Sequence, residues 1–177
     1  MKIALKIAAG ILVVVLLAVI GLRIFGPGPR NNKPGFWLKG EAVTTPVTDW
    51  SFTDAYQTIQ IQTHPWYLIP HSVTATCVSY NGNFYLTSNY NGGRQYPHGR
   101  RWNEDIARDP RVRMNIGGKL YDGVVTYLVT DPAEEGAVVE AKIKKYPPYG
   151  NYIAPNRKPP ADTQVILLRV VSAQTSS

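Results

Sequence analysis

The residues best suited to bind a ligand lie in the stretch 86–103, where hydroxyl and amide side chains lead into a Gly-Gly turn. Arg94, Arg100 and Arg101 follow this turn, and Trp102 comes directly after them. Glycine lets backbone N–H groups approach a phosphate closely, and guanidinium groups supply forked hydrogen-bond donors. Trp102 and the tyrosines nearby offer a stacking surface for a flat ring. The pattern indicates an anion site, and a solvated basic loop is the alternative that the same composition allows.

Other catalytic chemistry finds no support in the sequence. It contains no Gly-x-Ser-x-Gly elbow, no His-Glu-x-x-His and no Walker loop, so a triad hydrolase is not indicated. His64, His71 and His98 are scattered, and we interpret them as turn residues rather than metal ligands. Cys77 is the only cysteine, which excludes an intramolecular disulfide, and its setting within an expected strand indicates a small core residue.

An apolar run near the N-terminus, 7–25, is interrupted only by Arg23 and is long enough to span a membrane. Its 19 residues would extend about 28 Å as a helix, close to the roughly 30 Å hydrocarbon thickness. We therefore predict membrane localisation through a single-pass, uncleaved N-terminal anchor. A cleavable signal peptide and a buried core helix are the alternatives. Because basic residues flank both ends of the run, the side of the membrane is left open.

The chain beyond residue 26 carries only a small net positive charge. The whole sequence carries 19 Lys and Arg against 12 Asp and Glu, or +7. Three of these bases and no acid lie in residues 1–26, so 16 bases face 12 acids beyond them, or +4. The 44% hydrophobic content excludes a disordered chain. Six arginines between residues 94 and 113 would permit nucleic-acid binding, but the low charge and the membrane anchor argue against it.

Changes in composition divide the chain into an anchor (1–25), a Gly/Pro-rich linker (26–35) and one domain (36–177). We expect the linker to act as a stalk. Asn81-Gly82 and Gly117-Gly118 each separate two β-rich runs and predict hairpin turns. These signals favour an antiparallel barrel with two helices. The predicted strands are 56–63, 72–80, 84–88, 112–116, 119–130 with a bend at Gly123, and 163–171, followed by a frayed tail after Ser172.

Two short helices are predicted within the domain. The first covers 101–108 and must end before Pro110, because the residue before a proline disfavours the helical conformation. The second begins at Asp131, which we expect to cap it, and ends near residue 146. Glu134 is placed to reach back to the cap amide. A loop rich in Pro, Asn and Tyr is expected over 147–161.

The order of these elements resembles the split β-barrel flavin-binding superfamily, which includes pyridoxamine phosphate oxidase-like proteins and deazaflavin-dependent nitroreductases. The resemblance covers about residues 56–171 and is carried mainly by Asp-Pro-x-Val-x-Met-x-Ile at 109–116, followed by Gly-Gly-Lys-Leu-Tyr at 117–121. It implies a mainly β fold, an antiparallel split β-barrel with two short helices, preceded here by one N-terminal transmembrane helix. It also implies a homodimer with the cofactor at the subunit interface.

The resemblance further implies a cofactor, FMN or a deazaflavin (F420), held by a strand, its following turn and nearby basic residues. Oxidase-like members place an Arg and a Lys around the strand that corresponds to 72–76, and this sequence has neither there. A haem-like ligand or no cofactor at all are therefore alternatives. The matching cofactor-binding positions, together with the stacking residue Trp102, are Thr87, Ser88, Asn89, Gly92, Gly93, Arg94, Arg100, Arg101 and Trp102.

The leading hypothesis is a membrane-tethered flavin or deazaflavin oxidoreductase that reduces a quinone-like or nitro-compound acceptor. In such a protein the cofactor supplies the redox chemistry and the chain positions it, and no residue is assigned as catalytic. The alternative is a non-enzymatic binding module on the same barrel. It would recognise a lipid headgroup or another anionic ligand through Arg94, Arg100, Arg101, Arg111 and Arg113.

Overall fold

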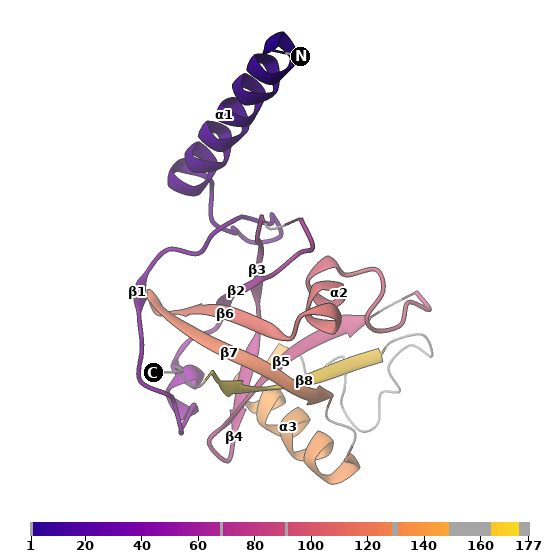
Figure 1. The fold of residues 1–177 in the computed structure, drawn as a ribbon. Helices are drawn as coiled ribbons and strands as arrows, with labels where there is room; N and C mark the ends of the chain where they lie inside the picture. Colours follow the sequence, from indigo (N-terminus) through magenta and orange to yellow (C-terminus); the bar gives the residue numbers. More distant parts are fainter. Residues whose placement is uncertain (1, 68, 91, 129–130, 149–163, 174–177) are drawn as a thin grey trace.

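The computed structural model describes residues 2–67, 69–90, 92–128, 131–148 and 164–173. One long helix projects from a domain built around a curved sheet (Figure 1). The loop expected over 147–161 lies almost wholly outside the described residues. The elements are α1 (Lys2–Phe25), β1 (Glu41–Ala42), the 3₁₀ helix η1 (Ser51–Ala55), β2 (Ile59–Thr63), β3 (His71–Ala75), β4 (Cys77–Tyr80), β5 (Asn83–Tyr90), α2 (Arg101–Arg108), β6 (Arg111–Ile116), β7 (Lys119–Leu128), α3 (Pro132–Lys145) and β8 (Gln164–Ser172).

The sheet is antiparallel along its main path, in the order β3-β2-β6-β7-β8-β5-β4, and the two-residue strand β1 adds to β7 in parallel. The predicted mainly β split barrel is therefore confirmed. β3 and β4 lie at opposite ends of this order, although only Thr76 separates them in the chain. The single strand predicted over 72–80 is wrong, because the chain breaks at Thr76 and passes from one end of the sheet to the other.

Both predicted hairpin turns are confirmed. Asn81 and Gly82 have φ of 48° and 73°, and Gly117 and Gly118 have φ of 60° and 86°. Two consecutive positive φ angles give the turn a twist that matches that of the flanking strands. Gly117 also has no room for a side chain, since a Cβ there would lie 2.3 Å from the Tyr56 hydroxyl.

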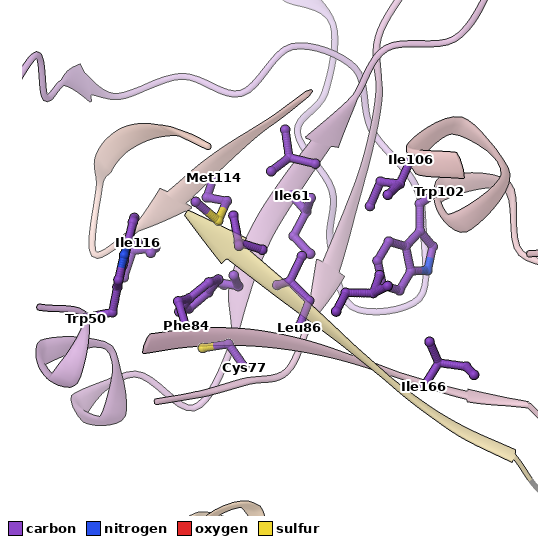
Figure 2. Close-up of a cluster of buried hydrophobic side chains, with 14 of the residues drawn as sticks. Trp50, Ile61, Cys77, Phe84, Leu86, Trp102, Ile106, Met114, Ile116 and Ile166 are labelled. Atoms are coloured by element: carbon purple, nitrogen blue, oxygen red, sulfur yellow. The ribbon is translucent and has the colours of Figure 1, made fainter. Parts of the chain in front are cut away.

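The main core lies inside the barrel (Figure 2). On β6, Val112, Met114 and Ile116 alternate with more exposed residues and point inward, as period-2 patterning predicts. α2 closes one end of the core with Trp102 and Ile106. Cys77 is fully buried in the same cluster, which confirms its interpretation as a core residue. A smaller cluster, formed by Val78, Tyr85, Val138 and Leu167, packs α3 on the outer face of the sheet.

No residue of α1 is buried, and the helix is long and apolar enough to cross a membrane, a test that a signal sequence also passes. The linker after α1 follows the surface of the domain. Gly35 exchanges two backbone hydrogen bonds with Ser72 of β3, at 2.8 and 2.9 Å. Gln62 of β2 is only 5% exposed and accepts a hydrogen bond from the Leu38 amide at 2.8 Å. The linker and the residues that follow it thus cover this face of β2.

The start of α3 agrees with the sequence in part. Asp131 caps the helix, because its carboxylate accepts a hydrogen bond from the Ala133 amide at 2.9 Å. Glu134, in the first turn, accepts a hydrogen bond from the Tyr85 hydroxyl at 2.6 Å and lies 3.7 Å from Arg169. This side chain therefore joins α3 to the sheet.

Gly123 allows close packing between neighbouring strands. A methyl group there would lie 2.7 Å from Val170 Cγ1 and 3.0 Å from the Val171 carbonyl oxygen. The ladder between β7 and β8 shifts register between Val125 and Tyr127. We expect Gly123→Ala to lower the free energy of unfolding by about 1–3 kcal/mol, measured by urea denaturation of the full chain in detergent.

Gly136→Ala is the matched control, because nothing lies within 4 Å of the added methyl group on α3. It should stabilise the helix by up to about 1 kcal/mol. Equal stability of Gly123→Ala and the unmodified protein would contradict the packing argument.

Candidate functional site

The candidate site is a cavity of about 380 Å³ between β3, the start of α2 and the linker. Lys33, Arg100 and Arg101 line it, so three cationic side chains border one space. Trp102 adds an aromatic wall and His71 adds an imidazole. No carboxylate is found among the lining residues that the structure describes. The cavity is therefore suited to a ligand that carries negative charge.

The orientation of α2 adds to this preference. The backbone of Arg100, which precedes the helix, is extended, and no side chain caps the first turn. The N-terminus of a helix carries partial positive charge and unpaired N–H groups, which favour a phosphate. Arg101 is held beside this terminus by Asp105 at 3.3 Å and lies over the ring of Tyr67 at 5.3 Å.

Two buried polar side chains fix α2 to the barrel. Asn103 donates to the Ser88 hydroxyl at 2.8 Å and to the Tyr90 hydroxyl at 2.5 Å. Asp105 accepts a hydrogen bond from the Thr63 hydroxyl at 3.0 Å. Breaking such a contact would leave a buried polar group unpaired, at a cost of about 1–3 kcal/mol. These contacts therefore hold the cations at the start of α2 in place.

His71 contributes a neutral imidazole. Its Nδ1 is buried and has no hydrogen-bond partner among the described residues. Burial lowers the pKa of His71; the nearby Asp105 carboxylate opposes this effect and Arg101 adds to it. The ring is therefore neutral at pH 7, and it offers one donor and one acceptor to a bound molecule.

The structure brings three of the nine predicted cofactor-binding residues to this cavity, namely Arg100, Arg101 and Trp102. Thr87 and Ser88 point to opposite faces of β5, as successive strand residues do. Thr87 contacts Lys142, whereas Ser88 contacts Asn103. The two hydroxyls therefore lie on different sides of the sheet.

The remaining predicted residues lie at or beyond the end of β5. Asn89 is paired with Val165 of β8. Gly92 and Gly93 have φ of 70° and 71°, with open space where a Cβ would be, so these glycines serve the turn. Arg94 folds back toward Gly99, where a Cβ would lie 3.1 Å from the arginine Cδ.

The sequence did not predict the other lining residues of the cavity, among them Lys33 and His71. Lys33 was assigned to a stalk, but Arg30 and Lys33 exchange backbone hydrogen bonds at 3.0 and 2.9 Å, in a tight turn with Asn31 at a φ of 50°. The Asn-Asn pair at 31–32 is a turn signal that could have indicated this shape. Nothing in the sequence indicates that the turn docks beside β3, where His71 lies.

A buried lysine on α3 was also missed. Lys142 is 2% exposed, and its ammonium donates to the Thr87 hydroxyl at 2.5 Å. The Thr87 hydroxyl lies 3.0 Å from that of Thr76. Burial lowers the pKa of Lys142 to about 7. Nothing in the sequence around Lys142 indicates this contact with β5.

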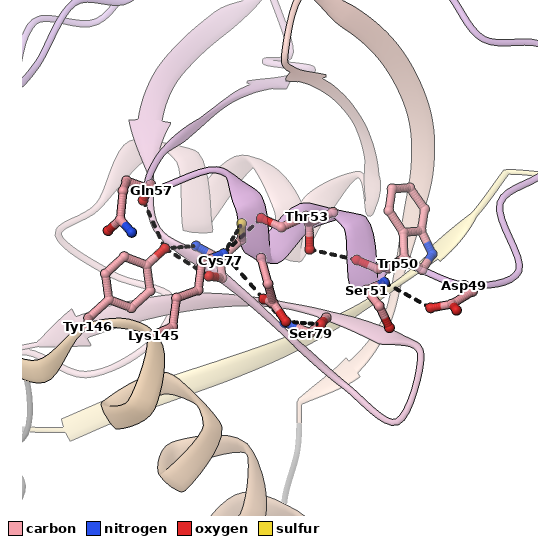
Figure 3. A network of polar contacts seen from close by, with 10 residues as sticks. Asp49, Trp50, Ser51, Thr53, Gln57, Cys77, Ser79, Lys145 and Tyr146 are labelled. Atoms are coloured by element: carbon pink, nitrogen blue, oxygen red, sulfur yellow. Dashed lines mark hydrogen bonds and ion pairs between the residues drawn. The ribbon is translucent and has the colours of Figure 1, made fainter.

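A second polar network lies between η1, β4 and the end of α3 (Figure 3). Lys145 donates to the Thr53 carbonyl oxygen at 2.9 Å and lies 3.6 Å from the Cys77 sulfur. The Tyr146 hydroxyl lies 2.9 Å from the Cys77 carbonyl oxygen. Burial raises the pKa of the Cys77 thiol, and Lys145 only partly opposes this. The network therefore joins α3 to the barrel around a protonated thiol.

The five arginines of the alternative binding module do not meet at one place. Arg100 and Arg101 line the cavity. Arg111 pairs with Asp109 at 2.6 Å, and Arg113 pairs with Asp122 at 2.7 Å. Their charges are therefore largely compensated within the chain.

Lys142 makes stability depend on pH. Its folded pKa of about 7 lies below the value of about 10.4 for an unfolded lysine, so between these values the unfolded chain binds the extra proton. We expect the free energy of unfolding to rise from pH 7 to 9.5 by up to about 1 kcal/mol per pH unit, measured by urea denaturation. Lys142→Met should flatten this rise.

Lys144→Met is the control, because Lys144 lies exposed on the same helix. It should keep the pH dependence of the unmodified protein. A Lys142→Met variant with an unchanged slope would show that the buried ammonium is not its source.

Comparison with known proteins identifies solved structures with a similar fold. No family model and no curated protein matches the sequence. Among solved structures, the haem storage protein HutZ of Vibrio cholerae matches with 15% identity over 70% of this chain and 86% of its own, at a TM-score of 0.50. An F420 reductase matches with 18% identity over 73% and 96%, at a TM-score of 0.48. A candidate pyridoxamine 5′-phosphate oxidase of Listeria innocua matches with 16% identity over 69% and 88%, at 0.47. The chain therefore has a split β-barrel fold, the fold that it shares with HutZ.

Proposed function

We propose that this chain is a membrane-anchored split-barrel protein that binds a flavin or deazaflavin and passes hydride or electrons to a membrane-associated acceptor. The observation that supports this most directly is the cavity bordered by Lys33, Arg100 and Arg101 at the start of α2. Its volume of about 380 Å³ falls in the range of small-molecule sites, roughly 300–1,000 Å³.

The lining residues suit the phosphate-bearing part of such a cofactor. The guanidinium groups of Arg100 and Arg101 and the ammonium of Lys33 can donate to phosphate oxygens. Trp102 presents apolar surface, and neutral His71 can hydrogen-bond a ring carbonyl or nitrogen. A bound flavin or deazaflavin would supply the redox chemistry, while these side chains bind and orient it.

The anchor suggests the class of acceptor. α1 would hold the domain at a bilayer, where apolar electron carriers dissolve. A quinone fits this setting, because it becomes a quinol by taking up one hydride and one proton. A nitro compound is the second acceptor class that the resemblance implies. The homodimer and the identity of the acceptor stay predictions.

The test is a titration of the full-length protein in detergent with FMN, deazaflavin F420 and haem, followed by absorbance and native mass spectrometry. Haem is included because HutZ is described as a haem storage protein. We expect FMN or F420 to bind, and the intact mass will report the number of subunits. Arg101→Gln should weaken binding about 10- to 100-fold, the effect of losing a charged hydrogen bond worth about 1.5–3 kcal/mol.

Lys119→Gln is the matched control, because Lys119 is exposed at the β6–β7 turn and does not line the cavity. It should bind as the unmodified protein does. Equal affinity in Arg101→Gln would show that the cofactor lies elsewhere. If the protein binds none of FMN, F420 and haem, the redox proposal is contradicted and the non-enzymatic binding module is favoured.

A further inference from the structure

A second cavity, of about 390 Å³, lies where α1 meets the domain. Its walls come from the last turn of α1, the segment between β2 and β3, and the junction of α2 with β6. It shares no lining residue with the candidate cofactor cavity. We call it the anchor cavity, and its lining residues include Arg23, Trp37, Trp66, Arg108, Asp109 and Arg111.

The anchor cavity has uncompensated positive charge. Four arginines line it against one carboxylate, Asp109. Arg111 forms an ion pair with this carboxylate, with 2.6 Å between Arg111 Nη2 and Asp109 Oδ2. The hydrogen bond from Arg111 lowers the pKa of Asp109 to about 2. Arg113, the fourth arginine, pairs with Asp122 outside the cavity. Arg23 and Arg108 have no carboxylate partner among the residues that the structure describes.

The contacts of these two arginines leave donors available. Arg23 lies over the Trp37 ring, 5.5 Å from its centroid, which orients the guanidinium without using its N–H groups. Arg108 donates one hydrogen bond to the His64 carbonyl oxygen, and a guanidinium has five N–H donors. Both side chains can therefore donate to an anion in the cavity.

The position of the cavity indicates where that anion comes from. Arg23 is two residues from Phe25, the end of α1. The segment between β2 and β3 lies at the end of the domain from which α1 projects (Figure 1). It exposes Trp66 at 73% and Tyr67 at 42%, and these two rings pack edge to face with centroids 5.6 Å apart. Exposed Trp and Tyr beside a membrane span are typical of the membrane–water interface.

We propose that the anchor cavity binds the headgroup of one anionic phospholipid, with Arg23 and Arg108 donating to the phosphodiester oxygens. Trp66 and Tyr67 lie in the interfacial layer around it. The proposal rests on the membrane anchoring proposed above and is independent of cofactor binding. A headgroup clamped between α1 and the domain would fix the height and orientation of the domain above the bilayer.

The test uses the full-length protein in nanodiscs of equimolar phosphatidylglycerol and phosphatidylcholine, with retained lipids identified by native mass spectrometry. We expect one phosphatidylglycerol to be retained in preference to phosphatidylcholine. Arg23→Gln and Arg108→Gln should each reduce this preference about 10-fold, and Lys119→Gln, which removes an exposed charge outside the cavity, should keep it. Arg23→Gln leaves the contacts of the domain core unchanged, so its result does not depend on the folding of the segment that Arg108 holds.

Two results would overturn the proposal. One is retention of both lipids in equal amounts by the unmodified protein, and the other is an equal loss of preference in all three variants. Extraction of native membranes with alkaline carbonate distinguishes failure of the headgroup site from failure of the membrane anchor. A protein released by carbonate has no spanning helix, which would overturn both proposals, whereas a protein that stays but does not select its lipid would overturn the headgroup site alone.

Discussion

One residue, Thr76, joins the two ends of the sheet, and the barrel depends on that junction. β3 pairs with β2 up to Ala75, and β4 pairs with β5 from Cys77 onward, so the chain turns from one half of the barrel to the other within a single residue. The corner is held from inside the structure, because the Thr76 hydroxyl lies 3.0 Å from Thr87 and Thr87 accepts a hydrogen bond from Lys142. A buried ammonium is costly in isolation, and here it ties α3 to the corner that closes the barrel.

α2 connects the two cavities. Arg101 lies at its first residue beside one cavity, and Arg108 lies at its last residue beside the other. Seven residues of helix place these positions roughly 10 Å apart along the axis, at about 1.5 Å per residue. Because buried Asn103 and Asp105 fix the helix to the barrel, the two sites keep a constant separation. The proposed electron-transfer site would then lie one short helix away from the lipid surface.

The elements that were predictable are those specified by local physics. The turn at Gly117-Gly118 needs positive φ, the Asp131 cap satisfies a free helix amide, and the Asp109-Pro110 pair ends α2, so each can be read from a few neighbouring residues. The features that were missed depend on which distant segments meet. Period-2 patterning continues through Thr76 and hides the break in the strand. Lys33, His71 and Lys142 lie far apart in the sequence, and their roles follow only from the docking of the linker and of α3.

The linker between α1 and the domain covers an edge that strands of other molecules could otherwise use. β3 is at one end of the sheet order, and its outer backbone groups at Ser72 are taken up by Gly35. An open strand edge is a template for intermolecular pairing and aggregation, which natural proteins prevent by covering it. Gly28 and Pro29 pack so closely on Gly35 that any side chain there would collide with their backbone, at 2.4 Å. A soluble fragment that begins after this segment would lose the cover, so solubility is best preserved by cutting within α1 and keeping every residue from Gly26 onward.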